Sequence, residues 1–377
     1  MNLGKNIGFL YYLSPFLTSH SIVENKLSLI LAILFGFKKI TIKLKSLPKL
    51  SFDTHDFTLM YYFVGSLTFS ASYKQLNENS AQLSFDLNNS FVIPLTNFSK
   101  EDKNLIETLF LCVRAGADFI TDNNKDISKY RKKTLKIFVD EGKKIIETFS
   151  GVKFYLDSIN AGNTIMECFI DDIHAITDSD DWSNKIVVDV GAECGDTPLY
   201  YASKGAKVYA FEPIKPNFDA MLRNMSLNPN LSANIIPINA AVGKDGKLNF
   251  FQAPDTPNIG SSFTYNRYGE NALQSLVDGI SFSKILEAYK IKKIDLLKMD
   301  CKGCEMYLNA SFLEHVDEIK IEYVAQFTSH KFEDIKKLLE DSGFVCMVYR
   351  NSQFARLSNR LNGHIYGKKT HTSKSVS

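Results

Sequence analysis

The sequence predicts an α/β protein, with a doubly wound, largely parallel sheet closed by an antiparallel edge hairpin and preceded by a smaller α+β domain. Three observations carry this prediction. From about residue 184, strands alternate with helices, as they do in parallel sheets. The first of these strands runs straight into a turn bracketed by Gly191 and Gly195 and then into a helix. Before residue 180, strands and helices follow one another without that alternation.

Length and composition fit two globular domains. The chain has 377 residues. We expect an α+β domain of unknown role over residues 1–180, the parallel-sheet domain over 181–365 and a disordered tail over 366–377. With 45% hydrophobic and 23% charged residues, the chain is neither mainly disordered nor fibrous. Lysine and arginine (44) nearly balance aspartate and glutamate (42), which argues against a surface built for nucleic acid.

The first half of the chain mixes strands and helices and carries no chemical motif. Residues 38–45 (KKITIKLK) alternate apolar and polar side chains, the pattern of a half-buried strand. The other expected elements are an apolar helix over 23–36, a buried segment over 57–66, strands around an Asn-rich turn over 73–95 and a helix within 103–120 that ends at Gly116.

Strands and helices then alternate in the second half. The expected strands are 185–190, 207–212, 234–242, 294–300, 319–324 and 344–350, and the expected helices are 196–205, 216–228, 281–290 and 331–343. The last strand and the residues QFARLS after it form the edge hairpin. An insertion between the third and fourth strands contains the segments 260–263 and 265–268, and is either a cover for the second substrate or a plain surface excursion.

The strongest chemical signal is the run DVGAECGDT (189–197), at the point where a strand enters a helix. Glycines let the backbone turn tightly and approach a ligand, and the helix start offers free N–H groups. The alternative is that the glycines only form the turn. The residues expected to bind a cofactor here are Asp189, Gly191, Ala192, Glu193, Gly195, Asp196 and Thr197.

Glu212 and Pro213 end the second strand, about 20 residues after the first glycine, where doubly wound folds place an acid for the ribose hydroxyls. The alternative is a solvated strand-end glutamate. The glycine spacing is G-x-x-x-G, so the G-x-G-x-x-G pyrophosphate fingerprint of dinucleotide enzymes is missing. This spacing favours S-adenosylmethionine over NAD.

Acidic residues also follow the fourth and fifth strands. Asp300 ends the strand 294–300, Glu305 follows five residues later, and Glu322 lies in the next strand. Ligands of open α/β sheets bind beyond the carboxyl ends of the strands, so we expect Asp300 to lie on the same side as Gly191. Acids gathered there can orient a hydroxyl group or remove its proton.

These runs, together with NAAVG (239–243) and IKIEY (319–323), resemble the FkbM-type class I methyltransferases in order and spacing, over roughly residues 184–348. The resemblance implies a Rossmann-like sheet, S-adenosylmethionine as methyl donor and a hydroxyl oxygen of a sugar, glycan or natural product as acceptor. The matching residues are Asp189, Gly191, Gly195 and Asp196 in the first motif, Glu212 as the ribose acid, Asn239, Ala240, Ala241 and Val242 near the adenine, Asp300, Gly303 and Glu305 in an acid-glycine-acid element, and Glu322.

Two positions depart from the family. Val324 stands where the family often has a histidine, and Lys302 where it commonly has an acid. A histidine base at 324 is therefore excluded, and His330 is a weak substitute. We predict Asp300 as the catalytic base, with Glu305 and Glu322 as supporting acids.

The six cysteines are scattered, so we expect reduced thiols in a cytoplasmic protein and no bound metal. Cys194, Cys301 and Cys304 leave open a metal or redox role. The apolar run 27–37 is too short to span a membrane, and no signal peptide is expected. Contact of the lysines after it with a membrane surface is possible but not favoured over packing in its own domain.

The expected function is therefore O-methyl transfer to a small-molecule or glycan acceptor, with no nucleic-acid partner. The oligomeric state is open. Two other classes remain open: an NAD-dependent enzyme, which the glycine spacing disfavours, and a non-catalytic nucleotide-binding or interaction module on the same fold.

Overall fold

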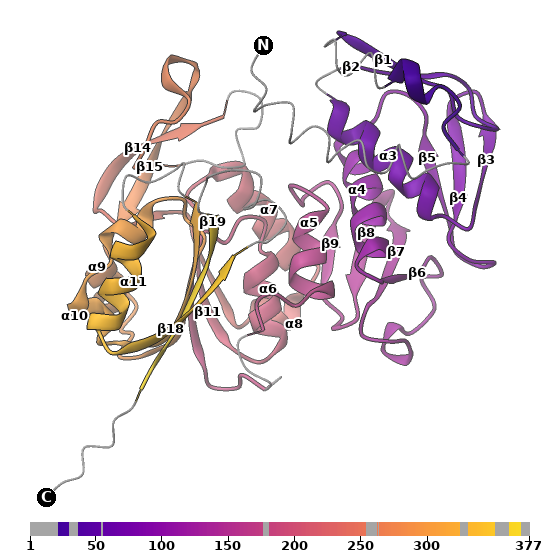
Figure 1. Ribbon diagram of the computed structural model, residues 1–377. Helices are drawn as coiled ribbons and strands as arrows, with labels where there is room; N and C mark the ends of the chain where they lie inside the picture. The colour runs from indigo at the N-terminus through magenta and orange to yellow at the C-terminus, as the bar shows by residue number, and fades with distance from the viewer. Residues whose placement is uncertain are drawn as a thin grey trace, which may run out of the picture. The chain divides into compact units, whose positions relative to one another are not determined.

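A computed structural model describes residues 22–29, 37–53, 56–175, 181–253, 262, 264–324, 331–350 and 362–370. The chain divides into two compact units, Met1–Ala175 and Ile176–Ser377 (Figure 1). Each unit has its own sheets and helices and is described separately below. Among the described residues, no helix has the length and apolar character needed to cross a bilayer.

Within its described residues, the N-terminal unit holds three sheets and two long helices. Its sheets are a β1–β2 pair, a three-stranded sheet in the order β3-β4-β5 and a four-stranded sheet in the order β6-β7-β8-β9. The elements are β1 (Lys39–Ile42), β2 (Leu50–Asp53), α3 (Phe57–Phe69), β3 (Ser72–Asn77), β4 (Ser80–Ser84), β5 (Ser90–Pro94), α4 (Lys100–Arg114), β6 (Asp118–Ile120), the short helix η2 (Ile127–Lys129), β7 (Thr134–Asp140), β8 (Lys143–Thr148), β9 (Lys153–Tyr155), α5 (Asn163–Ile165) and the π-helical turn η3 (Met166–Ile170).

The two long helices pack closely because a glycine lies at their contact. A Cβ on Gly65 of α3 would come within 2.2 Å of the Phe110 ring of α4. The α4 helix ends before Gly116, which adopts φ +85°, as predicted. Of the helix expected over 23–36, residues 26–29 are helical and residues 30–36 lie outside the described part of the chain.

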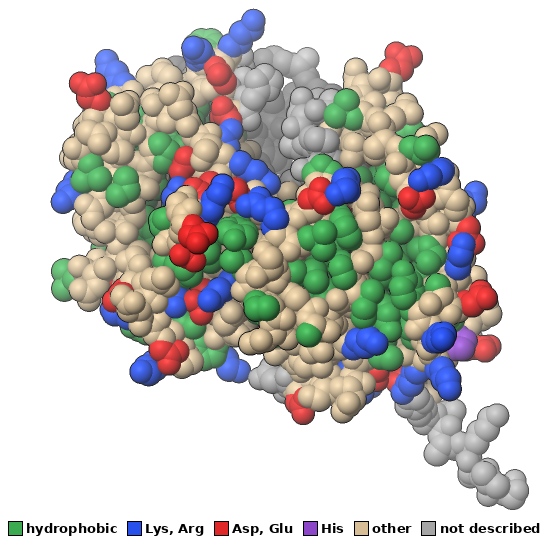
Figure 2. Space-filling view, turned by 180° about the vertical axis from the view of Figure 1, so that it is seen from behind, with side chains coloured by type: hydrophobic (Ala, Val, Ile, Leu, Met, Phe, Trp, Pro, Cys, Tyr) green, Lys and Arg blue, Asp and Glu red, His purple; other side chains and the backbone are tan. Residues whose placement is uncertain are grey.

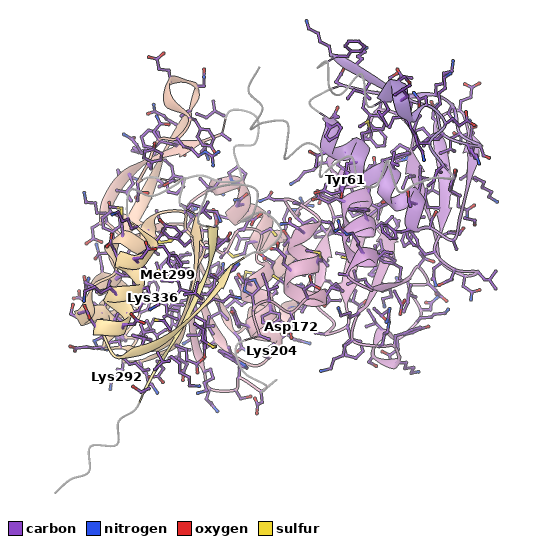
Figure 3. All side chains as sticks on the ribbon, in the orientation of Figure 1. Tyr61, Asp172, Lys204, Lys292, Met299 and Lys336 are labelled. Atoms are coloured by element: carbon purple, nitrogen blue, oxygen red, sulfur yellow. A yellow bond between two sulfur atoms is a disulfide. The ribbon has the colours of Figure 1, made fainter. Side chains whose placement is uncertain are left out.

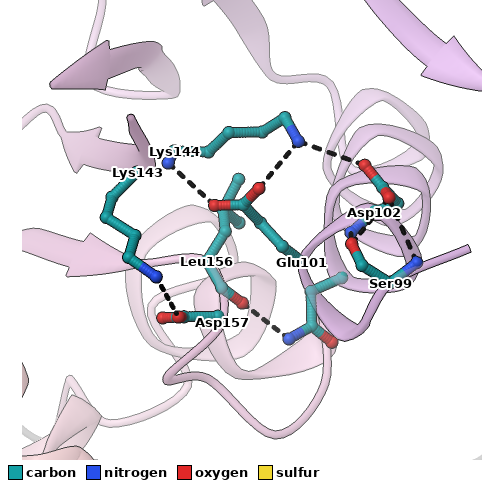
Figure 4. A network of polar contacts seen from close by, with 8 residues as sticks. Ser99, Glu101, Asp102, Lys143, Lys144, Leu156 and Asp157 are labelled. Carbon is teal, nitrogen blue, oxygen red and sulfur yellow. Dashed lines mark hydrogen bonds and ion pairs between the residues drawn. The ribbon is translucent and has the colours of Figure 1, made fainter. Parts of the chain in front are cut away.

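A network of polar contacts fixes the start of α4 (Figure 4). Ser99 caps the helix: its Oγ accepts the Asp102 N–H at 3.1 Å, and Asp102 accepts the Ser99 N–H in return. Lys144 of β8 reaches Glu101 at 2.8 Å and Asp102 at 3.1 Å. Burial alone would lower the pKa of Lys144, but these two carboxylates have a larger effect, so the pKa of Lys144 is raised. The pairing joins α4 to the four-stranded sheet.

The C-terminal unit is built on a seven-stranded sheet in the order β12-β11-β10-β16-β17-β19-β18. Its elements are β10 (Ile186–Val190), α6 (Asp196–Ser203), β11 (Lys207–Phe211), α7 (Lys215–Ser226), α8 (Pro229–Ser232), β12 (Ile235–Ile238), β13 (Ala241–Val242), β14 (Gly246–Gln252), η4 (Gly269–Asn271), β15 (Leu273–Ile280), α9 (Phe282–Ala288), β16 (Ile294–Met299), η5 (Cys304–Tyr307), α10 (Ala310–Leu313), β17 (Val316–Val324), α11 (Phe332–Asp341), β18 (Phe344–Arg350) and β19 (Asn362–Lys369).

The strands from β12 to β17 are parallel, whereas β19 pairs antiparallel with both β17 and β18. The chain passes from β10 outward to β12 and then returns to the other side of β10 with β16. The topological switch point therefore lies between β10 and β16, and ligands of such sheets bind beyond the carboxyl ends of these strands. Both strands are buried almost throughout, including Met299 at the end of β16 (Figure 3).

The insertion between the third and fourth strands differs from the predicted loop. Residues 234–242 form two strands in different sheets, because β12 joins the main sheet and β13 starts a small sheet in the order β13-β15-β14. The long antiparallel pair of β14 and β15 makes up most of the insertion (Figure 1). Ser262 bridges to Phe251, while residues 260, 261 and 263 of the predicted cover lie outside the described residues.

The predicted tail over 366–377 starts too early. Tyr366 to Lys369 belong to β19, between β17 and β18. These polar residues stay ordered because each finds a partner: the Tyr366 hydroxyl donates to Glu318 at 2.8 Å, and Lys369 donates to the Leu313 carbonyl at 2.7 Å. The polar composition of these residues predicted a solvated tail, whereas their side chains bond to other parts of the unit. Residues 371–377 lie outside the described residues.

The face seen in Figure 2 carries acidic and basic side chains interspersed with each other and with hydrophobic side chains, so neither charge forms a continuous field over the described residues there.

Candidate functional site

The glycine turn after β10 lies directly against the end of β16. Gly191 adopts φ +87°, and a Cβ built on it would lie 2.1 Å from the Asp300 carbonyl oxygen. The backbone contact continues through Asp300 N–H, which donates to the Val190 carbonyl at 2.8 Å. The expectation that Asp300 and Gly191 share the carboxyl edge of the sheet is therefore confirmed.

The second glycine starts helix α6. Gly195 adopts φ +88°, and a Cβ on it would meet Met221 of α7 at 2.9 Å. Between the glycines, Ala192 is buried and Glu193 adopts φ +45°. The Cys194 carbonyl accepts the Asn224 side-chain amide at 2.9 Å. Packing against α7 thus fixes the backbone of this turn, and the first N–H groups of α6, from Asp196 onward, follow directly.

Two of the predicted cofactor residues face the interior. Asp189 is fully buried and accepts a hydrogen bond from the Thr197 hydroxyl at 2.5 Å. Its other oxygen lies 2.9 Å from the ammonium of Lys298, which also donates to the Gly191 carbonyl at 2.8 Å. Burial raises the pKa of Asp189. Burial alone would lower the pKa of Lys298, but the surrounding carboxylates have a larger effect, so its pKa is raised. The side chains of Asp189, Thr197 and Lys298 thus stabilise the turn from its buried side.

Lys298 was missed at the sequence level. Its only signal is a lysine between apolar residues, after Leu297 and before Met299 in the run IDLLKM, where a buried ammonium needs a carboxylate partner.

Glu212 lies at the end of β11, where the sequence places it. It is 4% exposed, and its oxygens accept the backbone N–H groups of Glu193 and Ile214, both at 2.9 Å. Burial raises its pKa to about 7 despite these hydrogen bonds. The Asn217 side chain also hydrogen-bonds to this carboxylate. A carboxylate has about four acceptor positions, so about one remains for a ligand hydroxyl.

The residues around Glu212 hold its backbone. Asn239 donates its side-chain amide to the carbonyls of Glu212, at 2.8 Å, and Pro213, at 3.2 Å. Ala240 is buried beside it. Asn239 therefore fixes the end of β11 through the backbone and does not point its amide group away from the protein.

A second group of charges forms after β16 and β17. Lys302 lies between the carboxylates of Asp300 and Glu322, and its ammonium is 3.1 Å from Glu322. The side chains of Asp300 and Glu322 are each 31% exposed, which leaves both within reach of a ligand. Burial alone would raise the pKa of Asp300, but the positive charges of Lys302 and Lys298 have a larger effect, so this pKa lies well below its usual range. Burial and the Asp300 charge raise the pKa of Glu322 to about 7.

Glu305 interacts with the charges of Lys302 and Asp300 but is more deeply buried than the side chains of Asp300 and Glu322. It is 2% exposed and accepts the Gly303 N–H at 2.8 Å, and burial raises its pKa. The structure therefore places Glu305 as a buried support for the loop after β16.

The same loop corrects the prediction of six reduced thiols, because Cys301 and Cys304 form a disulfide. Both flank the loop residues Lys302 and Gly303, which adopt φ +52° and +120°, so the tight loop brings the two sulfurs together. One ligand atom each of Cys301, Cys304 and Glu305 lie within 4.8 Å of one another. The disulfide occupies both sulfurs, however, so they are not thiolate ligands in this structure. Cys194 is buried in the glycine turn and does not belong to this group.

Comparison with known proteins relates part of the C-terminal unit to methyltransferases. Residues 189–346 match the methyltransferase FkbM domain. The C-terminal unit carries an FkbM methyltransferase domain. Two relatives are each 28% identical: methyltransferase sdnD of Sordaria araneosa, over 51% of this chain and 85% of its own, and methyltransferase 1 of Beauveria bassiana (strain ARSEF 2860), over 49% and 81%.

Two solved structures also align with part of the chain. Precorrin-6y C5,15-methyltransferase from Geobacter metallireducens aligns over 50% of this chain and 81% of its own, with 10% identity and a TM-score of 0.28. Magnesium protoporphyrin IX methyltransferase from Synechocystis aligns over 50% and 71%, with 12% identity and a TM-score of 0.29.

The FkbM domain brings most of the predicted site residues to one edge of the sheet. Val324 is buried at 7% exposure and offers no base, and His330 lies outside the described residues. Sequence reasoning missed His364, which pairs directly with Glu322 across β17 and β19. Its only signal was the alternation NGHIYGKK near the end of the chain, which was divided between the sheet domain and the expected tail.

Proposed function

We propose that the FkbM domain transfers a methyl group from S-adenosylmethionine to a hydroxyl oxygen of a small-molecule or glycan acceptor. The observation that carries this proposal is the glycine turn packed against Asp300 and held beside Glu212 at the switch point of the sheet. The bound donor supplies a methyl group already activated on a sulfonium. The protein then has to bind and orient both partners, because positioning supplies most of the rate in such a transfer.

The residues present fit this donor. A Cβ at Gly191 or Gly195 would collide with neighbouring atoms, so the turn has no room for a side chain at these two positions. Glu212 retains about one acceptor position, enough for a ribose hydroxyl. The start of α6 adds backbone N–H groups on the same side.

The charges at this edge also suit a cationic donor. Asp189, Asp300 and Glu322 contribute three carboxyl groups, against the ammonium groups of Lys298 and Lys302. The surplus of acid favours a positively charged ligand, whereas a pyrophosphate would be repelled.

On the acceptor side, the charge group assigns different tasks to the predicted acids. Asp300 was the first choice of base, but a carboxylate whose pKa is held low by Lys302 is a weak base. Glu322, with a pKa of about 7, is matched to proton uptake near neutral pH. In the transfer, the new oxygen–carbon bond forms as the carbon–sulfur bond breaks, and the hydroxyl proton passes to Glu322. Asp300 stays charged and orients the hydroxyl.

Calorimetric titration of the full chain with S-adenosylmethionine, S-adenosylhomocysteine and NAD tests the donor. We expect micromolar binding of the first two and none of NAD. Transfer of labelled methyl groups to a panel of glycosides and hydroxylated natural products tests the reaction. A folded protein that binds neither sulfur ligand would overturn the proposal.

A further inference from the structure

His364 lies on the face of the sheet that carries the acceptor-side charges. Because β19 runs antiparallel to β17, it begins at the edge where the parallel strands end, and His364 is its third residue. His364 pairs directly with Glu322, and directly paired residues project from the same face of a sheet. The imidazole therefore lies beside the group formed by Asp300, Lys302 and Glu322.

One ring nitrogen of His364 lacks a partner. Its Nδ1 is closed off from solvent and has no hydrogen bond within the part of the chain that the structure describes. Leaving a buried polar atom unpaired costs about 1–3 kcal/mol, so such an atom calls for a functional explanation. The side chain as a whole is partly exposed. For Nδ1 to meet a ligand, the ring has to rotate about χ2, which is a soft torsion in histidine.

The surroundings keep this ring neutral. Burial and the positive charge of Lys320 on β17 lower the pKa of His364 to about 4, and Lys302 and Lys298 act in the same direction. Asp300 opposes them, as would the charged form of Glu322, the cross-strand partner. At neutral pH the imidazole thus has one nitrogen that accepts a hydrogen bond and one that donates.

We propose that His364 is an acceptor-binding residue, whose free ring nitrogen accepts a hydrogen bond from a hydroxyl of the methyl acceptor and holds that oxygen beside Glu322. This inference rests on the proposed function, and it names a residue that binds the acceptor of that reaction. The ring takes no proton in the reaction, because the proton passes to Glu322. The acceptor class that fits is a neutral polyol such as a glycoside, because a neutral ring nitrogen accepts a hydrogen bond from a hydroxyl group.

Three variants of the full chain test the role through turnover with the best methylated glycoside of the panel. His364→Ala removes the acceptor nitrogen, and we expect a 10- to 100-fold loss of kcat/KM with unchanged affinity for S-adenosylmethionine. His364→Asn places an amide oxygen near the position of Nδ1 and should restore most of that loss. Lys368→Ala, on the same strand, is the control and should behave like the natural chain. Equal losses in the alanine and asparagine variants, or none in either, would overturn the proposal.

A second measurement needs no methylated product. We would follow the ¹⁵N resonances of His364 in the natural chain bound to S-adenosylhomocysteine, with methyl glucoside as the hydroxyl probe. We expect a neutral ring with an unprotonated Nδ1 whose resonance shifts as the probe is added. A ring that is protonated at neutral pH, or indifferent to the probe, contradicts the proposal. Absence of S-adenosylhomocysteine binding would instead contradict the proposed function, so the two failures are distinguishable.

Discussion

The two sides of the sheet edge are built in different ways. The proposed donor side, around Gly191, Gly195 and Glu212, is defined by backbone: positive φ angles, a close approach of two strands and N–H groups donated to a buried carboxylate. The proposed acceptor side is defined by charged side chains in contact, with Lys302 between Asp300 and Glu322.

This difference predicts how each side responds to change. A backbone cradle tolerates almost no added atom, and its loss removes the ligand altogether. A group of paired charges can lose one member and adjust, because the remaining groups shift their pKa values. We therefore expect larger losses of ligand binding on the donor side, and on the acceptor side smaller losses that change with the pH of the assay.

The largest effect should come from Gly191→Ala. The new Cβ would lie 2.1 Å from the Asp300 carbonyl oxygen in a backbone with φ +87°. We expect binding of S-adenosylmethionine to fall more than about 100-fold, equivalent to about 3 kcal/mol or more. Calorimetric titration measures the affinity, and thermal unfolding measures the accompanying loss of stability.

Gly246→Ala is the matched control for Gly191. Its φ is +99°, but no atom lies within 4 Å of the added Cβ. It therefore carries the backbone strain of about 1–2 kcal/mol without the collision. If both variants lose donor binding equally, strain rather than the close approach to Asp300 explains the defect, and the comparison between the two sides fails.

Glu212→Gln should weaken donor binding by about 10-fold, because a neutral amide replaces a charged acceptor of hydroxyl groups. The carboxyl also predicts a pH dependence of stability. Its pKa is about 7 in the folded chain, against an ordinary value of 4.5. Between these values the folded state holds more protons than the unfolded state, so the free energy of unfolding contributed by Glu212 falls as pH rises from 4.5 to 7.

Chemical denaturation at several pH values measures this contribution as the difference between the natural chain and the Glu212→Gln variant. The variant lacks the titrating group and should show a smaller decline over that range. Parallel curves for the two chains would show that Glu212 titrates normally.

The sequence predicted the donor side better than the acceptor side, and the reason is physical. A strand, a glycine-bracketed turn and a helix are local in the chain, so Gly191 and Gly195 could be recognised from spacing alone. The ion pairs of Lys298 and Lys302, and the pairing of His364 with Glu322, depend on strands that are distant in sequence.

The fold shows the same division. The alternation of strands and helices predicted the parallel strands β10, β11, β16 and β17. It did not predict that residues 234–242 would divide between two sheets or that polar residues 366–369 would complete β19. In both places the outcome depends on partners elsewhere in the chain, which no local pattern reveals.

Lys302→Met should produce the clearest pH-dependent change. Lys302 lowers the pKa of both Asp300 and Glu322, so its removal raises both. The acid limb of the rate profile, which follows deprotonation of Glu322, should then move to higher pH. We expect about a 10-fold loss of turnover at neutral pH that is partly recovered at higher pH, with donor affinity nearly unchanged.

The control for this variant is Lys336→Met on α11, labelled in Figure 3, where the lysine forms an exposed pair with Glu340. Removing an exposed pair of this kind changes stability by less than about 1 kcal/mol and should leave the rate profile in place. If the pH–rate profile of Lys302→Met superimposes on that of the natural chain, Lys302 does not set the pKa of Glu322.

The smallest effect should follow the loss of the Cys301–Cys304 disulfide. The bridge closes a very short loop, so the entropy that it removes from the unfolded chain is at the low end for disulfides. The loop also has other supports, because Asp300 N–H bonds to Val190 and Gly303 N–H bonds to the buried Glu305. We expect the Cys301→Ser/Cys304→Ser variant to unfold a few degrees lower, with donor affinity within about twofold and turnover within about fivefold. Lys302 lies inside the bridged loop. A much larger fall in turnover at constant donor affinity would therefore mean that the disulfide, more than the ion pair with Asp300, positions Lys302.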